Sequence, residues 1–241
     1  MLSFSMNSSA QTCGFGCLGL GGFYAGYSFQ QYDPSGLNRY LDEYSQIKFY
    51  DPIPNTFDEF GTAKGFRLGA NVLRTKYKSW LFSFKGFYQF LNESKTSTLI
   101  TEERNYKSKL SLDLNYWGFG FDAGIFLFGF MDFKIVDAQL TFHSTKLNWT
   151  NEFEGTTDLQ YRNRKTNLGF QLGSGLIFHL AGDYISLETT AAYTQFSVSQ
   201  IEDENGRVFS YPSSENLPVD KFINKGGLTL LVQLNIGIPI Y

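Results

Sequence analysis

The sequence predicts an all-β fold, an eight-stranded antiparallel up-and-down β-barrel that crosses a membrane. Apolar residues alternate with polar or small residues in segment after segment, and a period of two residues is typical of strands with two unlike faces. The segments are 11 to 14 residues long, and a tilted strand needs about 9 to 11 residues to cross a bilayer. Aromatic residues make up 18% of the 241 residues and charged residues only 18%, which favours strands with an apolar exterior.

Eight segments carry the alternation. They span 18–30, 62–74, 79–91, 107–117, 133–144, 165–178, 184–197 and 227–240. The last segment shows the pattern most plainly, because every second residue from Leu230 to Ile240 is aliphatic. In the third segment, Phe82 and Phe84 alternate with positions that include Lys85. Charges therefore lie opposite the apolar face, which inverts the arrangement of a soluble barrel.

The apolar face of the predicted strands carries no charge. Because a lysine or arginine at the midplane of a lipid-facing surface costs roughly 2–4 kcal/mol, an uncharged face indicates contact with lipid. In segment 107–117 we expect Leu110, Leu112, Leu114 and Tyr116 on this lipid face.

The connections between the predicted strands alternate in length. Long polar connections are expected at 31–61, 92–106, 145–164 and 198–226, and short turns at 75–78 and 179–183. This asymmetry is typical of outer-membrane barrels, which have short periplasmic turns and, with eight strands, four long extracellular loops. Residues 118–131 allow two interpretations. Either the fourth strand continues into a turn at Asp122–Gly124, or Ile125–Met131 lies flat in the periplasmic interface.

The first long loop is expected to contain a short amphipathic helix. Leu37, Tyr40, Leu41 and Tyr44 follow Pro34-Ser35 at spacings of three and four residues, which places them on one helical face. Such a helix could cover the barrel mouth or offer a surface to a partner. Aromatic residues of the first and last loops form a candidate contact site, with freely solvated loops as the alternative: Tyr40, Tyr44, Tyr50, Phe57, Phe209, Tyr211 and Phe222.

Polar side chains on the other face of the strands are expected to fill the barrel. The predicted network consists of Arg67, Lys85, Asp113, Asp137, Glu188, Gln171 and Gln233. An eight-stranded barrel has an interior just wide enough for side chains, so buried charges there must pair with one another. We therefore expect a polar plug, with a narrow gated channel as the less favoured alternative.

The chain divides into two parts. Residues 1–17 are interpreted as the remnant of an export signal and a periplasmic segment, and residues 18–241 as the transmembrane barrel domain. Cys13 and Cys17 could form a disulfide in an oxidising periplasm or remain two free thiols. No acidic residue or histidine lies beside them, so no zinc site is expected there.

Enzymatic chemistry, cofactors and metals are not expected. His143 and His179 are the two histidines, and the sequence places no acid partner beside either; phosphate-binding and nucleophile motifs are also missing. A net charge of −3 gives no basis for nucleic-acid binding. The expected partners are outer-membrane lipid and, through the loops, other outer-membrane or secretion-machine proteins.

The alternating strands, the Ala10-Gln11 junction and a last strand ending in Tyr241 resemble those of small eight-stranded outer-membrane proteins. The resemblance is to the OmpA/OmpX-like class, and specifically to the outer-membrane β-barrel families of Bacteroidota, and it covers the chain from about Gly19. It implies a non-enzymatic, multi-pass protein of the cell outer membrane that stabilises the envelope, adheres, or serves a larger machine as an accessory subunit. Tyr241 departs from the usual terminal signature because it is out of phase with Ile240.

Two other functions fit parts of this pattern. A soluble lipocalin-like ligand-binding barrel also has eight antiparallel strands, but it would stay folded and monomeric in plain buffer. A lipid A-modifying outer-membrane enzyme would need a catalytic histidine, for which His143, beside Ser144, is the candidate.

Overall fold

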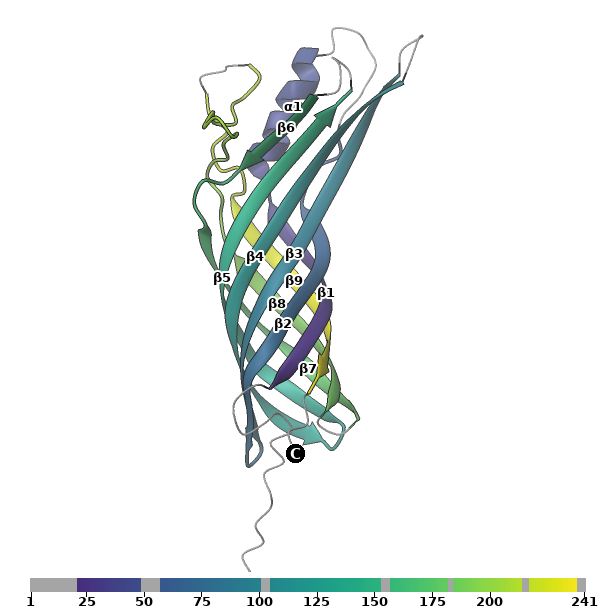
Figure 1. Cartoon of the computed structure of the whole chain (residues 1–241), viewed down its shortest axis with the longest axis vertical. Coiled ribbons are helices and arrows are strands. Elements are labelled where there is room, and N and C mark those ends of the chain that lie inside the picture. Colours follow the sequence, from purple (N-terminus) through teal and green to yellow (C-terminus); the bar gives the residue numbers. More distant parts are fainter. Residues whose placement is uncertain are drawn as a thin grey trace, which may run out of the picture.

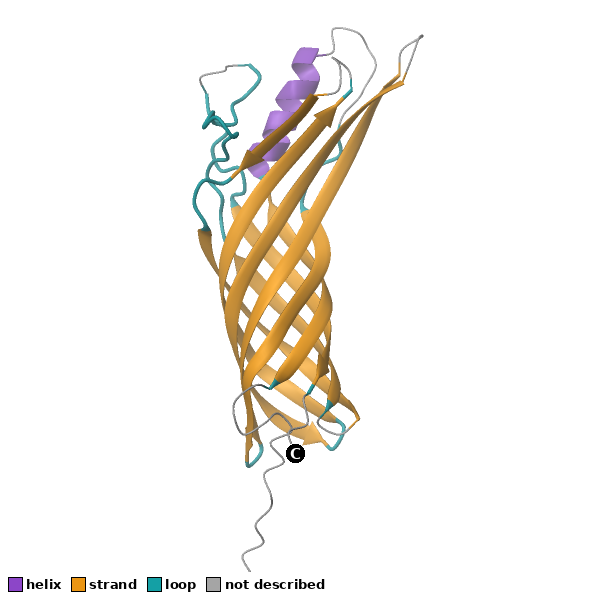
Figure 2. Ribbon diagram, in the orientation of Figure 1, coloured by secondary structure: helices purple, strands orange, loops and turns teal. Residues whose placement is uncertain are grey.

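Nine strands form one antiparallel sheet that closes on itself (Figures 1 and 2). The computed structural model describes residues 21–48, 57–100, 105–152, 157–181, 184–213 and 217–237. In the sheet the strands follow the order β4-β3-β2-β1-β9-β8-β7-β5-β6, and β4 also pairs with β5, which closes the ring. The predicted all-β antiparallel barrel is therefore confirmed.

The strands and the helix have the following bounds. They are β1 Gly22–Asp33, α1 Ser35–Lys48, β2 Thr62–Tyr77, β3 Trp80–Ile100, β4 Asn105–Phe128, β5 Met131–Asn151, β6 Thr157–Arg162, β7 Asn167–Ala181, β8 Ile185–Gln195 and β9 Lys225–Ile236. Both β6 and β7 pair with β5, β6 along Lys146–Asn151 and β7 along Met131–His143. The nine strands thus occupy eight positions around the barrel, because β6 and β7 share one.

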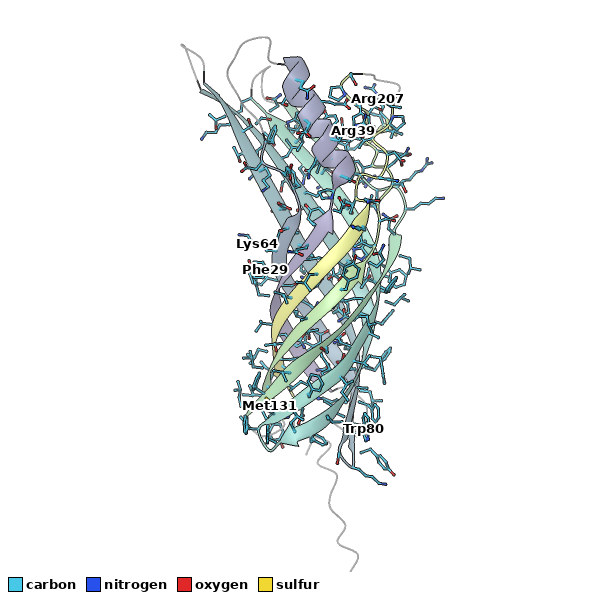
Figure 3. The ribbon with its side chains drawn as sticks, turned by 180° about the vertical axis from the view of Figure 1, so that it is seen from behind. Phe29, Arg39, Lys64, Trp80, Met131 and Arg207 are labelled. Atoms are coloured by element: carbon cyan, nitrogen blue, oxygen red, sulfur yellow. The ribbon has the colours of Figure 1, made fainter. Side chains whose placement is uncertain are left out.

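The barrel has two unlike ends. One, called the helix end below, carries α1 and β6; the other, called the turn end, carries tight turns such as the one at Lys78–Ser79 between β2 and β3. Figure 3 shows Trp80 and Met131 near the turn end and Arg39 and Arg207 near the helix end.

Three strands run well past the ring toward the helix end. β3 extends to Ile100, β4 begins at Asn105, and β5 extends to Asn151. Strand pairing thus occupies much of what the sequence predicted as the long connections 92–106 and 145–164. The sequence predicted loops here because the outward side chains of these segments are polar. Polar outward side chains are also what a sheet in water has.

Residues 118–131 extend the fourth strand, but not to the turn that was expected. β4 continues through Asp122 to Phe128, and the chain turns at Gly129 and Phe130 before β5 begins. The prediction of a turn at Asp122–Gly124 is wrong, because Gly124 pairs with Lys134 inside the β4–β5 ladder. The alternative of a segment lying flat is also wrong.

An uncharged belt surrounds the lower part of the barrel. Its large outward side chains include Phe23, Phe29, Phe66, Leu68, Phe84, Phe90, Trp117, Phe119, Phe121, Leu140, Leu168, Phe170, Leu172, Tyr193, Leu230, Val232 and Leu234, each at least 40% exposed. On β4 the outward series runs from Trp117 to Leu127, which is about 34 Å along the strand. A tilt of about 45° reduces that length to a belt roughly 24 Å tall.

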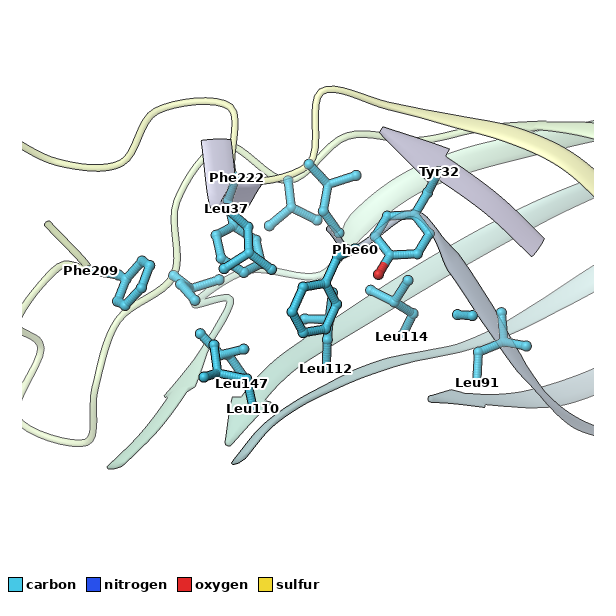
Figure 4. Close-up of a cluster of buried hydrophobic side chains, with 14 of the residues drawn as sticks. Tyr32, Leu37, Phe60, Leu91, Leu110, Leu112, Leu114, Leu147, Phe209 and Phe222 are labelled. Carbon is cyan, nitrogen blue, oxygen red and sulfur yellow. The ribbon is translucent and has the colours of Figure 1, made fainter. Parts of the chain in front are cut away.

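The head is the part of the molecule beyond the belt: α1, residues 57–61, 196–213 and 217–223, and the helix-end parts of β3 to β6. Its interior is apolar, and Figure 4 shows a cluster that brings Leu37 of α1 and Phe222 to Leu110 and Leu112 of β4. Leu37 is fully buried. The head therefore has a hydrophobic core of its own, which covers the mouth of the barrel.

Helix α1 confirms the prediction of an amphipathic helix. It begins at Ser35, directly after Pro34, and buries Leu37, Tyr40 and Leu41 on one face. The side-chain nitrogen of Asn38 donates to the Phe60 carbonyl at 3.0 Å, and the backbone amide of Phe60 donates to the Asn38 side-chain oxygen at 3.0 Å. This pair of bonds attaches the helix to the chain that returns to β2.

Candidate functional site

The centre of the barrel holds a layer of buried ion pairs, named here the ionic layer: Lys85, Asp122, Lys134, Asp137 and Glu188. The Lys85 ammonium lies 2.9 Å from Asp122 Oδ1 and 2.8 Å from Asp137 Oδ2. The Lys134 ammonium lies 2.6 Å from the same Asp137 oxygen and also binds Glu188. All five side chains are buried, so each charge depends on the others for compensation.

Arg67 extends this layer toward the helix end. Its Nε donates to Gln89 at 2.7 Å and its Nη1 donates to Gln139 at 3.1 Å. Its guanidinium carbon lies 4.1 Å from the centre of the Phe87 ring, a distance at which a cation and an aromatic face attract. Gln139 donates in turn to Asp137 at 2.6 Å, so the two polar groups form one network.

Six of the seven residues predicted for the interior lie inside. They are Arg67, Lys85, Asp137, Glu188, Gln171 and Gln233, each at most 4% exposed. Gln171 accepts a hydrogen bond from Thr194 at 3.1 Å, and Gln233 donates to Asn235 at 2.9 Å. The seventh, Asp113, lies on the outer face of β4 and accepts hydrogen bonds from Asn92 at 2.7 Å and Asn148 at 3.2 Å.

The phase assigned to the fourth strand is therefore wrong. Leu110, Leu112, Leu114 and Tyr116 point inward and are buried, whereas Asp113 points outward. Alternation shows that a strand has two faces, but it does not show which face meets lipid. This part of β4 lies in the head, where the apolar face packs into the core.

The sequence interpretation missed Asp122 and Lys134. Asp122 was assigned to a possible turn, and Lys134 would face outward if simple alternation continued from Asp137. A β-bulge reverses this, because the β5–β7 register shifts between Lys134 and Asp137 and both intervening residues, Ile135 and Val136, point outward. Two adjacent aliphatic residues between Lys134 and Asp137 were the available signal.

Close packing around the ionic layer supports its role as a plug. A Cβ atom on Gly120 would lie 2.6 Å from the Lys85 Cε, so the missing side chain makes room for the lysine. Carboxylate oxygens of Asp122, Asp137 and Glu188 lie within 4.8 Å of one another. The two ammonium groups already contact these oxygens, so the chain supplies its own counter-ions.

The predicted aromatic contact site is not an exposed surface. Tyr40, Tyr211 and Phe222 are buried in the core of the head, and so is Phe209; Tyr44 and Phe57 are partly buried and pack against it. The Tyr40 ring lies 4.3 Å from the Phe209 ring, and burial raises the pKa of the Tyr40 hydroxyl. Tyr50, Cys13 and Cys17 lie outside the described residues.

The two histidines occupy different places. His143 stacks on Phe196 at 4.1 Å and bonds Thr141 at 2.9 Å through Nε2. His179 lies at the turn end, with Nε2 2.7 Å from Asp132, so the expectation that neither histidine has an acid partner is wrong for His179. The recorded partners of His143 include no carboxylate.

Comparisons with known proteins give a likeness of fold. No family model matches the chain and no curated protein matches it, so the resemblance to Bacteroidota families gains no support. Among solved structures, the chain is similar to the crystal structure of Ail, the attachment invasion locus protein of Yersinia pestis. The identity is 12%, the match covers 90% of this chain and 97% of that chain, and the TM-score is 0.39. A likeness at this level does not indicate function.

Helices give no candidate membrane span. Within the described ranges, no helix is long and apolar enough to cross a bilayer.

Proposed function

We propose that this chain is a non-enzymatic integral outer-membrane β-barrel, closed by its ionic layer, whose head presents binding surface to other proteins. The observation that carries the proposal is the belt. It exposes a continuous ring of Phe, Leu, Trp and Tyr side chains, and none of its described outward side chains is charged. Monomeric soluble proteins rarely expose apolar patches of more than a few hundred Å², so such a ring needs an apolar solvent.

The dimensions of the belt support a bilayer as that solvent. A height of roughly 24 Å is close to the apolar band of about 25 Å found on outer-membrane barrels. Every strand of the ring pairs with two neighbours over most of the belt, which satisfies backbone groups that hydrocarbon could not. Beyond Asn71, β2 pairs with β3 alone among the described residues.

The interior of the barrel favours a structural role over that of a pore or a ligand-binding cavity. Lipocalin-like barrels have an apolar cavity, whereas this barrel encloses charged side chains that bond to one another. Charges held in fixed pairs leave little freedom for a permeating ion. This favours a structural role for the lumen.

The head supports binding to other proteins through the edges of its strands. β2 pairs with β3 only as far as Asn92, so among the described residues β3 has β4 as its single strand neighbour over 93–100. Strand edges of this kind can accept a further strand from a partner chain. This surface replaces the aromatic contact site that the sequence suggested.

Detergent dependence tests the proposed function directly. The purified chain is expected to fold only with detergent micelles or lipid vesicles, and to aggregate when they are removed. Circular dichroism with size-exclusion chromatography measures both properties. A folded monomer that persists in plain buffer would contradict the proposal and favour a soluble barrel.

A further inference from the structure

A bulged link of four residues, 163–166, joins β6 to β7 just beyond the belt. Arg162 at the end of β6 lies opposite Lys146, and Asn167 at the start of β7 lies opposite His143. From Arg162 to Asn167 the chain advances five residues, whereas β5 advances only three between the residues they face. The extra residues therefore bulge outward from the sheet. Arg164 and Lys165 in this link are exposed.

Asn163 holds the link in a defined shape. Its side-chain oxygen accepts a hydrogen bond from the Thr145 amide at 2.8 Å. Its side-chain nitrogen donates to the carbonyl of His143 at 3.2 Å and to that of Lys165 at 2.6 Å. The Asn163 backbone amide also donates to the Thr145 carbonyl at 3.1 Å. Together these bonds hold the link where it leaves the β5 ladder and fix the backbone that carries Arg164 and Lys165.

Four cationic side chains gather here: Lys146, Arg162, Arg164 and Lys165. Lys146 and Arg162 are directly opposite on the outer face of the β5–β6 pair, an arrangement of like charges that destabilises a sheet. Among the described residues, Lys146, Arg162 and Lys165 form no ion pair.

Two carboxylates near the cluster leave it basic. Glu202 lies 4.0 Å from Arg164, whose side chain is still 79% exposed. Asp113 is the cross-strand neighbour of Lys146, but its recorded bonds go to Asn92 and Asn148. Four cations against two carboxylates give a local excess of positive charge in a chain whose net charge is −3.

The height of the cluster matches that of lipid headgroups. The belt ends beside the link at Phe142 and Leu168, which pair across β5 and β7. Leu168 is 63% exposed. Lys146 lies four residues beyond Phe142, or about 10 Å higher for a strand tilted by about 45°. The headgroup layer reaches roughly 5–8 Å beyond the hydrocarbon, so long basic side chains here reach its phosphates.

We propose that Lys146, Arg162, Arg164 and Lys165, positioned by Asn163, bind the phosphate of a phosphorylated membrane-lipid headgroup. The inference rests on the proposed function, because only a barrel seated in a bilayer brings this cluster to lipid phosphates. The phosphate occupies the space between the like-charged side chains, and the acyl chains lie against Phe142 and Leu168.

Lipid titration in a non-ionic maltoside micelle tests the proposal. Short-chain phosphatidic acid is expected to shift the amide NMR signals of residues 144–146 and 162–168 saturably, whereas short-chain phosphatidylcholine binds much more weakly. The double change Arg164→Gln/Lys165→Gln is expected to weaken phosphatidic acid binding roughly 10- to 25-fold, at about fivefold for each cation removed. Asn163→Ala is expected to weaken binding while all four cations remain.

The matched control is Lys64→Gln/Lys225→Gln, which removes two exposed lysines elsewhere near the belt boundary and is expected to leave the affinity unchanged. Figure 3 places Lys64 beside Phe29. Equal affinity of the Arg164/Lys165 variant and the unchanged chain would overturn the inference. So would inorganic phosphate binding as tightly as the lipid, or shifts centred elsewhere. Because all variants are compared in micelles that keep the barrel folded, this failure is distinct from a chain that folds without detergent.

Discussion

At the scale of single residues, the ionic layer depends on a local irregularity. Lys134 lies inside only because the bulge at Ile135 and Val136 changes the phase of β5. The sequence predicted Asp137 and Lys85 inside because regular alternation places them there. It could not place Lys134, because a bulge depends on the neighbouring strand as much as on its own residues.

Loss of Lys134 is expected to destabilise the barrel without opening it. Lys134→Ala leaves Asp137 and Glu188 with fewer cations in a buried site, and removing one partner of a buried pair costs about 3–5 kcal/mol. Urea unfolding in lipid vesicles measures the loss of unfolding free energy. Lys64→Ala, which changes an exposed lysine, serves as the control and should alter it by about 0.5 kcal/mol or less. An unchanged stability for Lys134→Ala, or single-channel currents from the unaltered chain in planar bilayers, would argue against a locked plug.

At the scale of elements, β4 obeys two opposite rules along its length. In the belt it turns Trp117, Phe119 and Phe121 outward and Asp122 inward, whereas in the head it buries Leu112 and turns Asp113 outward. The proposed function explains this inversion, because in a bilayer the solvent around β4 changes from hydrocarbon to water. The sequence predicted the strand. The face was assigned wrongly because the apolar face was assumed to point outward along the whole of β4.

Helix α1 is expected to depend on its buried face. Leu37→Ala removes a fully buried side chain from the core of the head, at a cost of about 2–5 kcal/mol. The free energy of local opening of α1, measured by hydrogen exchange, should fall, while the exchange of the belt strands stays unchanged. Gln46→Ala, at an exposed position of the same helix, should leave exchange unaltered. Equal effects of the two changes would mean that α1 is not held by this core.

At the scale of the whole molecule, two environments divide one barrel. On the proposed function, the uncharged belt and polar lumen form a membrane-spanning shell, and the apolar core of the head lies in a part of the molecule folded in water. Period-two patterning made the shell predictable from sequence. The head was not predictable in the same way, because its core joins α1, residues 196–213 and 217–223, and the ends of strands that are far apart in the chain.

Tryptophan quenching by brominated lipids tests the orientation of the shell most directly. Trp80 and Trp117 are outward residues of the belt, 45% and 43% exposed, whereas Trp149 is 7% exposed in the head and donates to Ser108. In vesicles containing lipids brominated on their acyl chains, variants that retain only Trp80 or only Trp117 should lose most of their fluorescence. A variant that retains only Trp149 should keep its fluorescence. Strong quenching of Trp149, with Trp80 and Trp117 unaffected, would contradict a barrel whose apolar belt faces lipid.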